Sequence, residues 1–146
     1  MRGTGIGLAV ACLTVSLLSV GLSSQPAPDE TPECYERMAT AEFSKQEEEA
    51  VKRGEPWPHN PLLVALKFVG EDAGCSCRTI VICRPEGGGP ATVEVTDEGL
   101  RDDSVRSHKF KLRLVRGASG AWQITEALRA WACWRGHTEY STEPCI

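Results

Sequence analysis

The spacing of apolar residues changes once along the chain, from helical intervals to strict alternation, close to residue 78. Over residues 31–53, the apolar side chains that recur at helical intervals are Tyr35, Met38, Ala39, Phe43 and Ala50. Thr31 and Pro32 suit the start of a helix, and Gly54 and Pro56 suit its end. The pattern predicts a long amphipathic helix with a charged, solvated face. The side chains of that face are Glu42, Lys45, Glu47, Glu48, Glu49 and Lys52.

A second, shorter helix is predicted over residues 61–69. Asn60 suits the N-cap position, Pro61 suits the first turn, and Gly70 suits the end. The apolar residues of this segment are Leu62, Leu63, Leu66 and Val69.

The later part of the chain has the alternating pattern of strands that are buried on one face. Four strands are predicted, over 79–83, 91–96, 109–114 and 122–133, with turns rich in glycine or polar residues between them. Alternation breaks near Ala127, which predicts a bulge there. The order of elements predicts an α+β fold, in which the long and short helices pack on a curved antiparallel sheet of about four strands.

The N-terminus has the pattern of an export signal. Within residues 1–24, Arg2 precedes an apolar run over 6–22 that ends in small polar residues. Residues 25–30 are then expected to form a flexible mature N-terminus. We therefore expect a secreted or periplasmic protein. Two alternatives are an uncleaved membrane anchor and a lipid attached at Cys12.

Composition and charge narrow the class of protein. The chain has 146 residues, of which 41% are hydrophobic, and this suits one globular domain. That domain is expected over 31–132, followed by a terminal loop over 133–146. The formal net charge of −4 argues against a nucleic-acid partner, because phosphate contacts need a basic surface.

Six cysteines remain if the signal is removed with Cys12, and an even number in an exported chain predicts disulfide bonds. These six are Cys34, Cys75, Cys77, Cys83, Cys133 and Cys145. Cys133 and Cys145 bracket the terminal loop and are expected to pair. Cys75 and Cys77 lie too close together to pair comfortably, so separate partners are expected in a domain with three bridges.

A zinc site built from Cys75, Cys77, Cys83 and a histidine is the alternative use of these thiols. The spacing departs from that of zinc-binding motifs, and no histidine lies near these cysteines in sequence. We therefore expect no metal site, and no cofactor motif is present.

Three segments, 91–95, 110–116 and 120–124, together resemble the closing strands of the nuclear transport factor 2-like superfamily, which has a cone-shaped, cystatin-like fold. The ending over 133–145 resembles a tail of small exported bacterial members. The resemblance implies a conical pocket between helix and sheet. The superfamily contains isomerases, dehydratases and polyketide cyclases as well as proteins without catalytic activity, so the fold does not decide the function.

Catalysis in such a pocket would need a base and a donor to a developing oxyanion. Tyr35 and His108 are the only candidates for this pair. The pocket-facing positions of the strand over 109–114 are apolar, which argues against an enzyme.

The terminal loop is a candidate binding surface. Closed by a disulfide, it would display Trp134, Arg135, His137 and Tyr140, and aromatic and arginine side chains dominate binding hot spots. Under the structural alternative, Trp134 and Tyr140 cover the open sheet, while His137 forms a local polar pair with Glu139.

The sequence therefore predicts an exported, non-catalytic binding domain with an apolar pocket for an unknown small apolar ligand. One alternative is a pocket isomerase or lyase that acts on a small apolar substrate. Another is a structural cell-envelope protein, which binds an envelope partner or forms a homodimer through the basic outer face of its sheet. Lys109, Lys111 and Arg113 supply that face.

Overall fold

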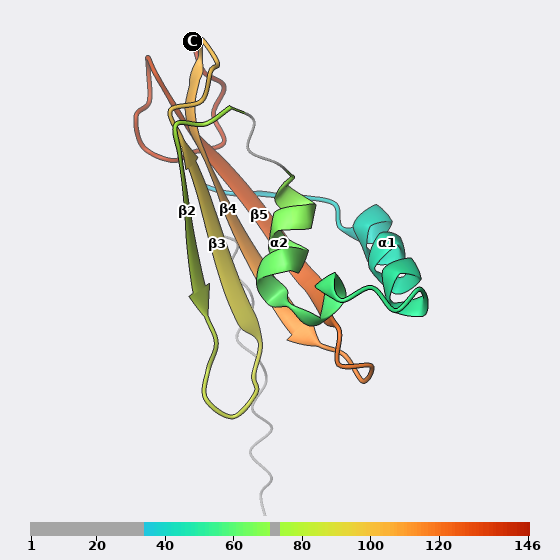
Figure 1. Cartoon of the computed structure of the whole chain (residues 1–146). Coiled ribbons are helices and arrows are strands. Elements are labelled where there is room, and N and C mark those ends of the chain that lie inside the picture. The colour runs from blue at the N-terminus through green and yellow to red at the C-terminus, as the bar shows by residue number, and fades with distance from the viewer. Residues whose placement is uncertain (1–33, 71–73) are drawn as a thin grey trace, which may run out of the picture.

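The computed structural model describes residues 34–70 and 74–146, which form two helices and a five-stranded antiparallel sheet (Figure 1). The chain is an α+β protein, as the sequence predicts. In chain order the elements are β1 (Glu36–Arg37), α1 (Ala41–Lys52), the 3₁₀ turn η1 (Trp57–His59), α2 (Pro61–Val69), β2 (Cys77–Cys83), β3 (Ala91–Glu98), β4 (Val105–Arg116) and β5 (Trp122–Cys133). The predicted signal segment 1–24 and the segment 25–30 lie outside the described residues.

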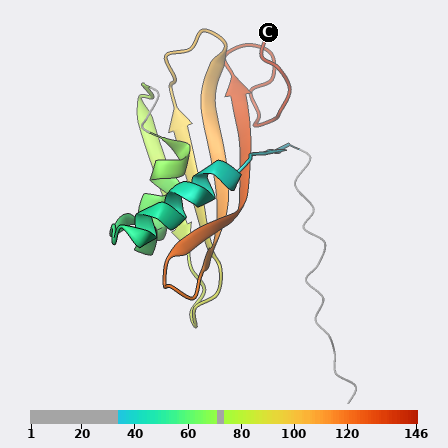
Figure 2. The same ribbon diagram turned by 90° about the vertical axis from the view of Figure 1, so that its right-hand side faces the viewer.

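The strand order in the sheet is β1-β5-β4-β3-β2, so β2 forms one edge and the short β1 lies at the other. Consecutive strands from β2 to β5 pair as antiparallel hairpins, with Val95 opposite Phe110 and Leu112 opposite Ala127. Both helices lie on the same face of the sheet, called the inner face below, and α1 lies beside the end of the β4–β5 hairpin (Figures 1 and 2).

The hydrophobic core lies between the helices and the inner face. Alternate residues of β3 and β4 point into it and are fully buried, including Val93, Val95 and Leu112. From the helical layer, the rings of Phe43 and Phe68 meet edge to face with 5.2 Å between their centroids. Alternation along these strands therefore predicted the buried face correctly.

The short helix and the four predicted strands are present. The side chain of Asn60 caps α2 by accepting a hydrogen bond from the backbone N–H of Leu62, at 3.0 Å. Strand β5 covers the predicted range, and β2, β3 and β4 extend the other three. The pairing of β4 with β5 has two irregularities, one between Val105 and Ser107 and one between Arg113 and Leu114. The second leaves Thr125 unmatched, two residues before the predicted bulge at Ala127.

The long N-terminal helix is shorter than predicted, because the chain before it pairs with the sheet. Glu36 and Arg37 form β1 against β5, and the backbone N–H of Met38 donates to the carbonyl of Ala127 at 2.8 Å. Helix α1 therefore begins at Ala41, and the sheet has five strands instead of about four. The predicted helix start at Thr31 lies outside the described residues.

One side chain that was assigned to the solvated face of the long helix is buried. Glu47 is 2% exposed and lies on the core side of α1, with Phe43 and Ala50. None of the helices in the described part of the chain is long and apolar enough to cross a membrane.

Candidate functional site

An open groove runs between α2 and β2. Strand β2 pairs with β3 on one side only, and α2 packs over β3, β4 and β5, so the inner side of β2 is partly uncovered. The groove has a volume of about 810 Å³, within the range of small-molecule sites. Its lining residues are Trp57, Leu63, Leu66, Lys67, Gly70, Arg78 and Ile80. Leu63, on the rim, is 40% exposed.

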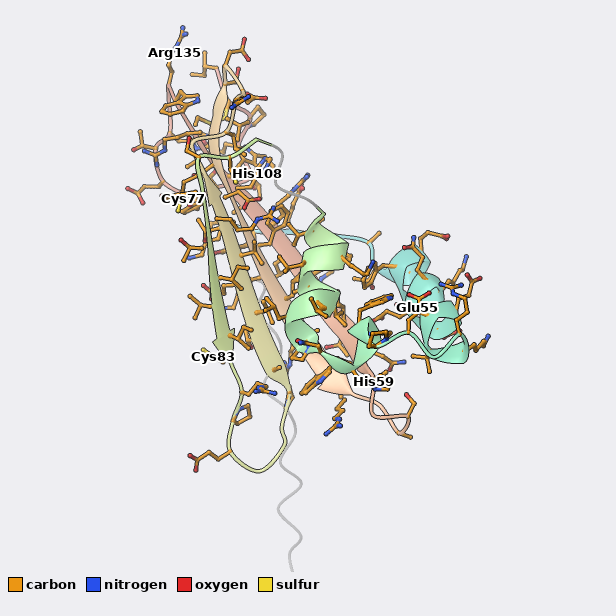
Figure 3. The ribbon with its side chains drawn as sticks, in the orientation of Figure 1. Glu55, His59, Cys77, Cys83, His108 and Arg135 are labelled. Carbon is orange, nitrogen blue, oxygen red and sulfur yellow. A yellow bond between two sulfur atoms is a disulfide. The ribbon has the colours of Figure 1, made fainter. Side chains whose placement is uncertain are left out.

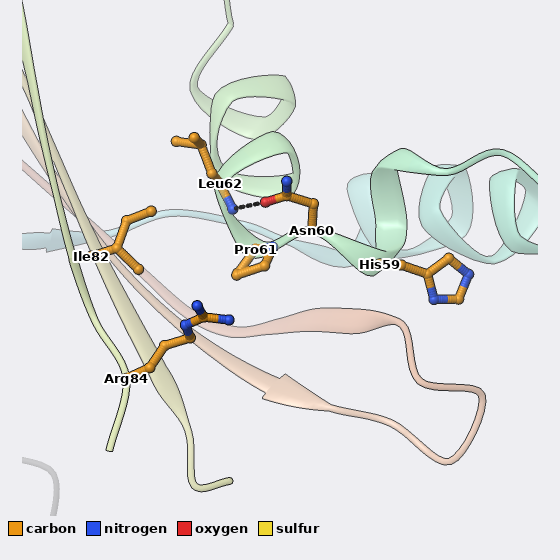
Figure 4. A pocket seen from close by; sticks show the side chains of 6 residues that line it. All are labelled: His59, Asn60, Pro61, Leu62, Ile82 and Arg84. Carbon is orange, nitrogen blue, oxygen red and sulfur yellow. Dashed lines mark hydrogen bonds between the residues drawn. The ribbon is translucent and has the colours of Figure 1, made fainter. Parts of the chain in front are cut away.

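A second hollow continues along the same strip of β2, toward the start of α2 (Figure 4). Its volume is about 540 Å³, and it is lined by His59, Asn60, Pro61, Leu62, Ile82 and Arg84. Ile82 of β2 and Arg84, which directly follows the strand, extend toward Pro61, whereas the ring of His59 points away (Figure 4). Ile80 and Ile82 lie on the same face of β2, so the two hollows share one apolar wall.

The charged side chains along this strip are basic. Lys67 and Arg78 line the larger groove and Arg84 lines the second hollow, while no carboxylate is among the described residues that line either one. The ammonium of Lys67 lies 5.2 Å from the centre of the Trp57 ring. The strip therefore combines an apolar wall with basic side chains, of which Arg78 is already paired with Asp97, although the whole chain has a net charge of −4.

Arg78 is fixed in the groove wall by a buried ion pair. Its guanidinium donates to both carboxylate oxygens of Asp97, at 2.5 and 2.7 Å, and to the carbonyl of Gly70 at 3.0 Å. Since Asp97 is 3% exposed, this fork joins β2 to β3 and to the end of α2.

His108, one of the two catalytic candidates, also lies on the inner face, opposite Asp97. Its ring meets Phe110 edge to face, with 5.9 Å between centroids. Burial lowers the pKa of His108, and the nearby charge of Arg129 lowers it further. The neutral imidazole is thus favoured at this position.

Tyr35, the other catalytic candidate, is on the opposite side of the sheet. It lies beside Lys109, Glu94 and Tyr140, and burial raises the pKa of its hydroxyl. Lys109 follows His108 in β4, so their side chains point to opposite faces. The structure therefore does not bring Tyr35 and His108 together on one substrate.

The terminal loop packs mainly against its own domain. The indole of Trp134 donates to the carbonyl of Asp102 at 3.0 Å, although the residue remains 49% exposed. The hydroxyl of Tyr140 accepts a hydrogen bond from Ser107 at 3.2 Å, and its ring lies 5.6 Å from the Lys109 ammonium. Arg135 is exposed at the tip (Figure 3). Of the predicted binding residues, Tyr140 thus holds the loop to β4, and Trp134 holds it to the connection between β3 and β4.

The predicted disulfide between Cys133 and Cys145 is present, with 5.5 Å between the Cα atoms. His137 lies next to it, with Nε2 3.1 Å from the Cys133 sulfur and 2.8 Å from the carbonyl of Glu143. The contact of His137 with Glu139 is to the backbone carbonyl. Cys133, His137 and Cys145 each place one potential ligand atom within 4.8 Å of the others, but sulfurs in a disulfide are not the thiolates that bind metals.

The predicted bridges of Cys34, Cys77 and Cys83 are not formed in the part of the chain that the structure describes. In the described residues, Cys34, Cys77 and Cys83 are exposed, free thiols, and the Cys75 thiol lies 3.8 Å from Asp97 Oδ1. Cys77 and Cys83 stand at the two ends of β2 (Figure 3), roughly 20 Å apart at the rise of an extended strand. That separation also excludes a zinc site that uses both.

Glu47 is a feature that the sequence interpretation missed. It lines a small cavity of about 220 Å³ between α1 and the β4–β5 hairpin, together with Val51, Ala121 and Trp122. Both carboxylate oxygens are buried without a hydrogen-bond partner in the part of the chain that the structure describes. Burial raises the pKa of Glu47 to about 7. Its spacing of four residues after Phe43 and three before Ala50 is the signal that identifies its face.

No protein-family model matches the chain, and no match was found among the curated proteins or the solved structures.

Proposed function

We propose that this protein is a non-catalytic binding domain and that the groove between α2 and β2 binds a small amphipathic anion. The observation that carries the proposal is the composition of the groove wall. Its apolar part is formed by Leu63, Leu66 and Ile80, and its charged lining groups are basic.

An apolar chain would fit along β2, where it would remove exposed side chains from water. Leu63 and Ile82 are 40% and 39% exposed, and burying apolar surface contributes about 25 cal/mol per Å². An anionic end group would be favoured by Lys67 or by Arg84. Arg78 is less suited to this role, because its charge is already matched by Asp97.

The separation of Tyr35 from His108 supports binding over catalysis, because it removes the one pair of groups that had suggested a reaction. Export from the cell and membership of the nuclear transport factor 2-like superfamily remain predictions from the sequence.

The test is calorimetric titration with dodecanoate, and with dodecyltrimethylammonium as the cation of matched chain length. We expect the anion to bind more tightly than the cation. Leu63→Glu should weaken dodecanoate binding at least tenfold, about 1.4 kcal/mol, because it places a carboxylate on the apolar rim.

Val115→Glu is the matched control. Val115 is also 40% exposed but lies at the end of β4, outside the groove lining. The substitution therefore adds the same charge away from the groove. Equal losses in the two variants would contradict the assignment to this groove. Equal binding of the anion and the cation would contradict the role of the basic side chains.

A further inference from the structure

The outer side of β2 is an open sheet edge. In the described part of the chain, β2 pairs only with β3, so half of its backbone N–H and C=O groups have no strand beside them. The opposite edge of the sheet is covered, because β5 pairs with β1 and also with Ser141 of the terminal loop.

The composition of β2 favours pairing with another strand. Natural edges are usually protected by lysine, proline, a bulge or an inward-pointing charge. Strand β2 has no lysine, proline or bulge, and the charge of its inward-pointing Arg78 is matched by Asp97. Its middle is Thr79-Ile80-Val81-Ile82, and Val81 is 50% exposed. The strand contains no carboxylate, and its single base, Arg78, is turned inward to Asp97.

The two cysteines of β2 are placed symmetrically about its centre. Cys77 lies three residues before Ile80 and Cys83 three residues after it. Arg78, Ile80 and Ile82 pair with inward-facing residues of β3, so the odd-numbered residues point to the outer face. Both thiols are therefore exposed on the same side of the sheet.

We propose that two copies of this chain pair edge to edge through β2, antiparallel about Ile80, and that Cys77 of each copy forms a disulfide with Cys83 of the other. In this register Arg78 lies opposite Ile82, and Thr79 lies opposite Val81. No like charges oppose each other in these pairs.

The geometry of an antiparallel pair suits these bridges. Directly opposed residues have Cα atoms about 4.5 to 5.5 Å apart, and disulfides span about 4.4 to 6.8 Å. The symmetry axis stands perpendicular to the sheet, which keeps the outer faces of both copies on one side. The result is one continuous sheet in which two covalent bridges secure an otherwise small interface.

The oxidant is a small-molecule disulfide such as oxidised glutathione. A Cys77 thiolate attacks one of its sulfurs, which forms a mixed disulfide and releases one small thiolate. The opposing Cys83 thiolate then displaces the second small thiolate. Each bridge consumes one small disulfide and yields two small thiols, which take up the two protons lost by the cysteines. Two bridges per dimer balance four protein thiols against two small disulfides.

The experiment follows the full chain in a glutathione redox buffer by non-reducing electrophoresis and by sedimentation. We expect a dimer of twice the chain mass that reductant dissociates on the gel. Trypsin cuts after Lys67 and after Arg78, so peptide mapping should find the 68–78 peptide, which holds Cys75 and Cys77, joined to the peptide that holds Cys83. Fragmentation of the joined peptides should assign the bridge to Cys77.

Paired variants test the register. Cys77→Ser or Cys83→Ser alone should give no covalent dimer, because each remaining thiol faces a serine. An equal mixture of the two variants should restore the dimer, because Cys83 of one then faces Cys77 of the other. Cys34→Ser is the control and should behave as the unchanged chain, since Cys34 is also an exposed thiol but lies outside β2.

Three results would overturn the proposal. The unchanged chain could remain monomeric in the oxidising buffer. Either single variant could still form a covalent dimer, which would indicate unspecific oxidation. Loss of the dimer in Cys34→Ser would place the contact elsewhere.

Discussion

Replacing Glu47 by glutamine is expected to remove a large part of the pH dependence of stability. The protein should lose roughly 3 kcal/mol of unfolding free energy between about pH 4 and pH 8 through this one group. In Glu47→Gln this loss should be absent. The unfolding free energy of the variant, relative to that of the unchanged protein, should therefore rise by this amount as the pH rises. Urea unfolding at both pH values measures the difference.

The sign follows from the pKa of Glu47 in each state. Burial raises it to about 7 in the folded protein, whereas the ordinary value for an exposed glutamate is 4.5. The folded state therefore binds the proton more tightly. The stability that this proton provides is fully present below the unfolded pKa and is lost as the pH rises through about 7.

Glu48→Gln is the control for the change of net charge. Glu48 is the next residue of α1 and borders the same cavity, but it is exposed. Its replacement makes the same change of net charge without removing a buried carboxyl group, so it should not reproduce the effect of Glu47→Gln. Parallel curves for Glu47→Gln and the unchanged protein would show that the Glu47 carboxylate is solvated in the folded state.

The elements that the sequence predicted well are those in which each residue obeys a local rule. Strict alternation over 109–114 identified β4 and its buried face, because side chains in a strand point to opposite sides in turn. Asn60 and Gly70 identified the two ends of α2, because caps act on neighbouring backbone groups. The Cys133–Cys145 bridge was predictable because these cysteines bracket the terminal loop.

The features that were missed depend on contacts between distant parts of the chain. The spacing of apolar residues predicts that Glu36 and Arg37 are helical. In the structure they pair with β5, and this strand pairing overrides their local preference. The groove likewise cannot be read from the sequence, because it arises where α2 leaves β2 uncovered. Cys77 and Cys83 were assigned to bridges within the chain, since spacing alone does not show that they stand at opposite ends of one strand.

Replacing Asp97 by alanine is expected to cost about 3 to 5 kcal/mol of stability, because it removes one partner of a buried ion pair. The Asp97 side chain is 4% exposed and that of Arg78 is 16% exposed. After the change, the guanidinium keeps the carbonyl of Gly70 but loses the two oxygens that it contacts at 2.5 and 2.7 Å. Unfolding in urea measures the loss.

Glu94→Ala separates this effect from the loss of any carboxylate on β3. Glu94 points to the outer face, where it pairs with Lys109 at 3.6 Å and Lys111 at 3.9 Å while remaining 34% exposed. Pairs so open to solvent contribute up to about 1 kcal/mol. We therefore expect Asp97→Ala to cost several times more than Glu94→Ala. Equal costs would mean that the Arg78–Asp97 pair is solvated, and that it does not fix the groove wall between β2 and α2.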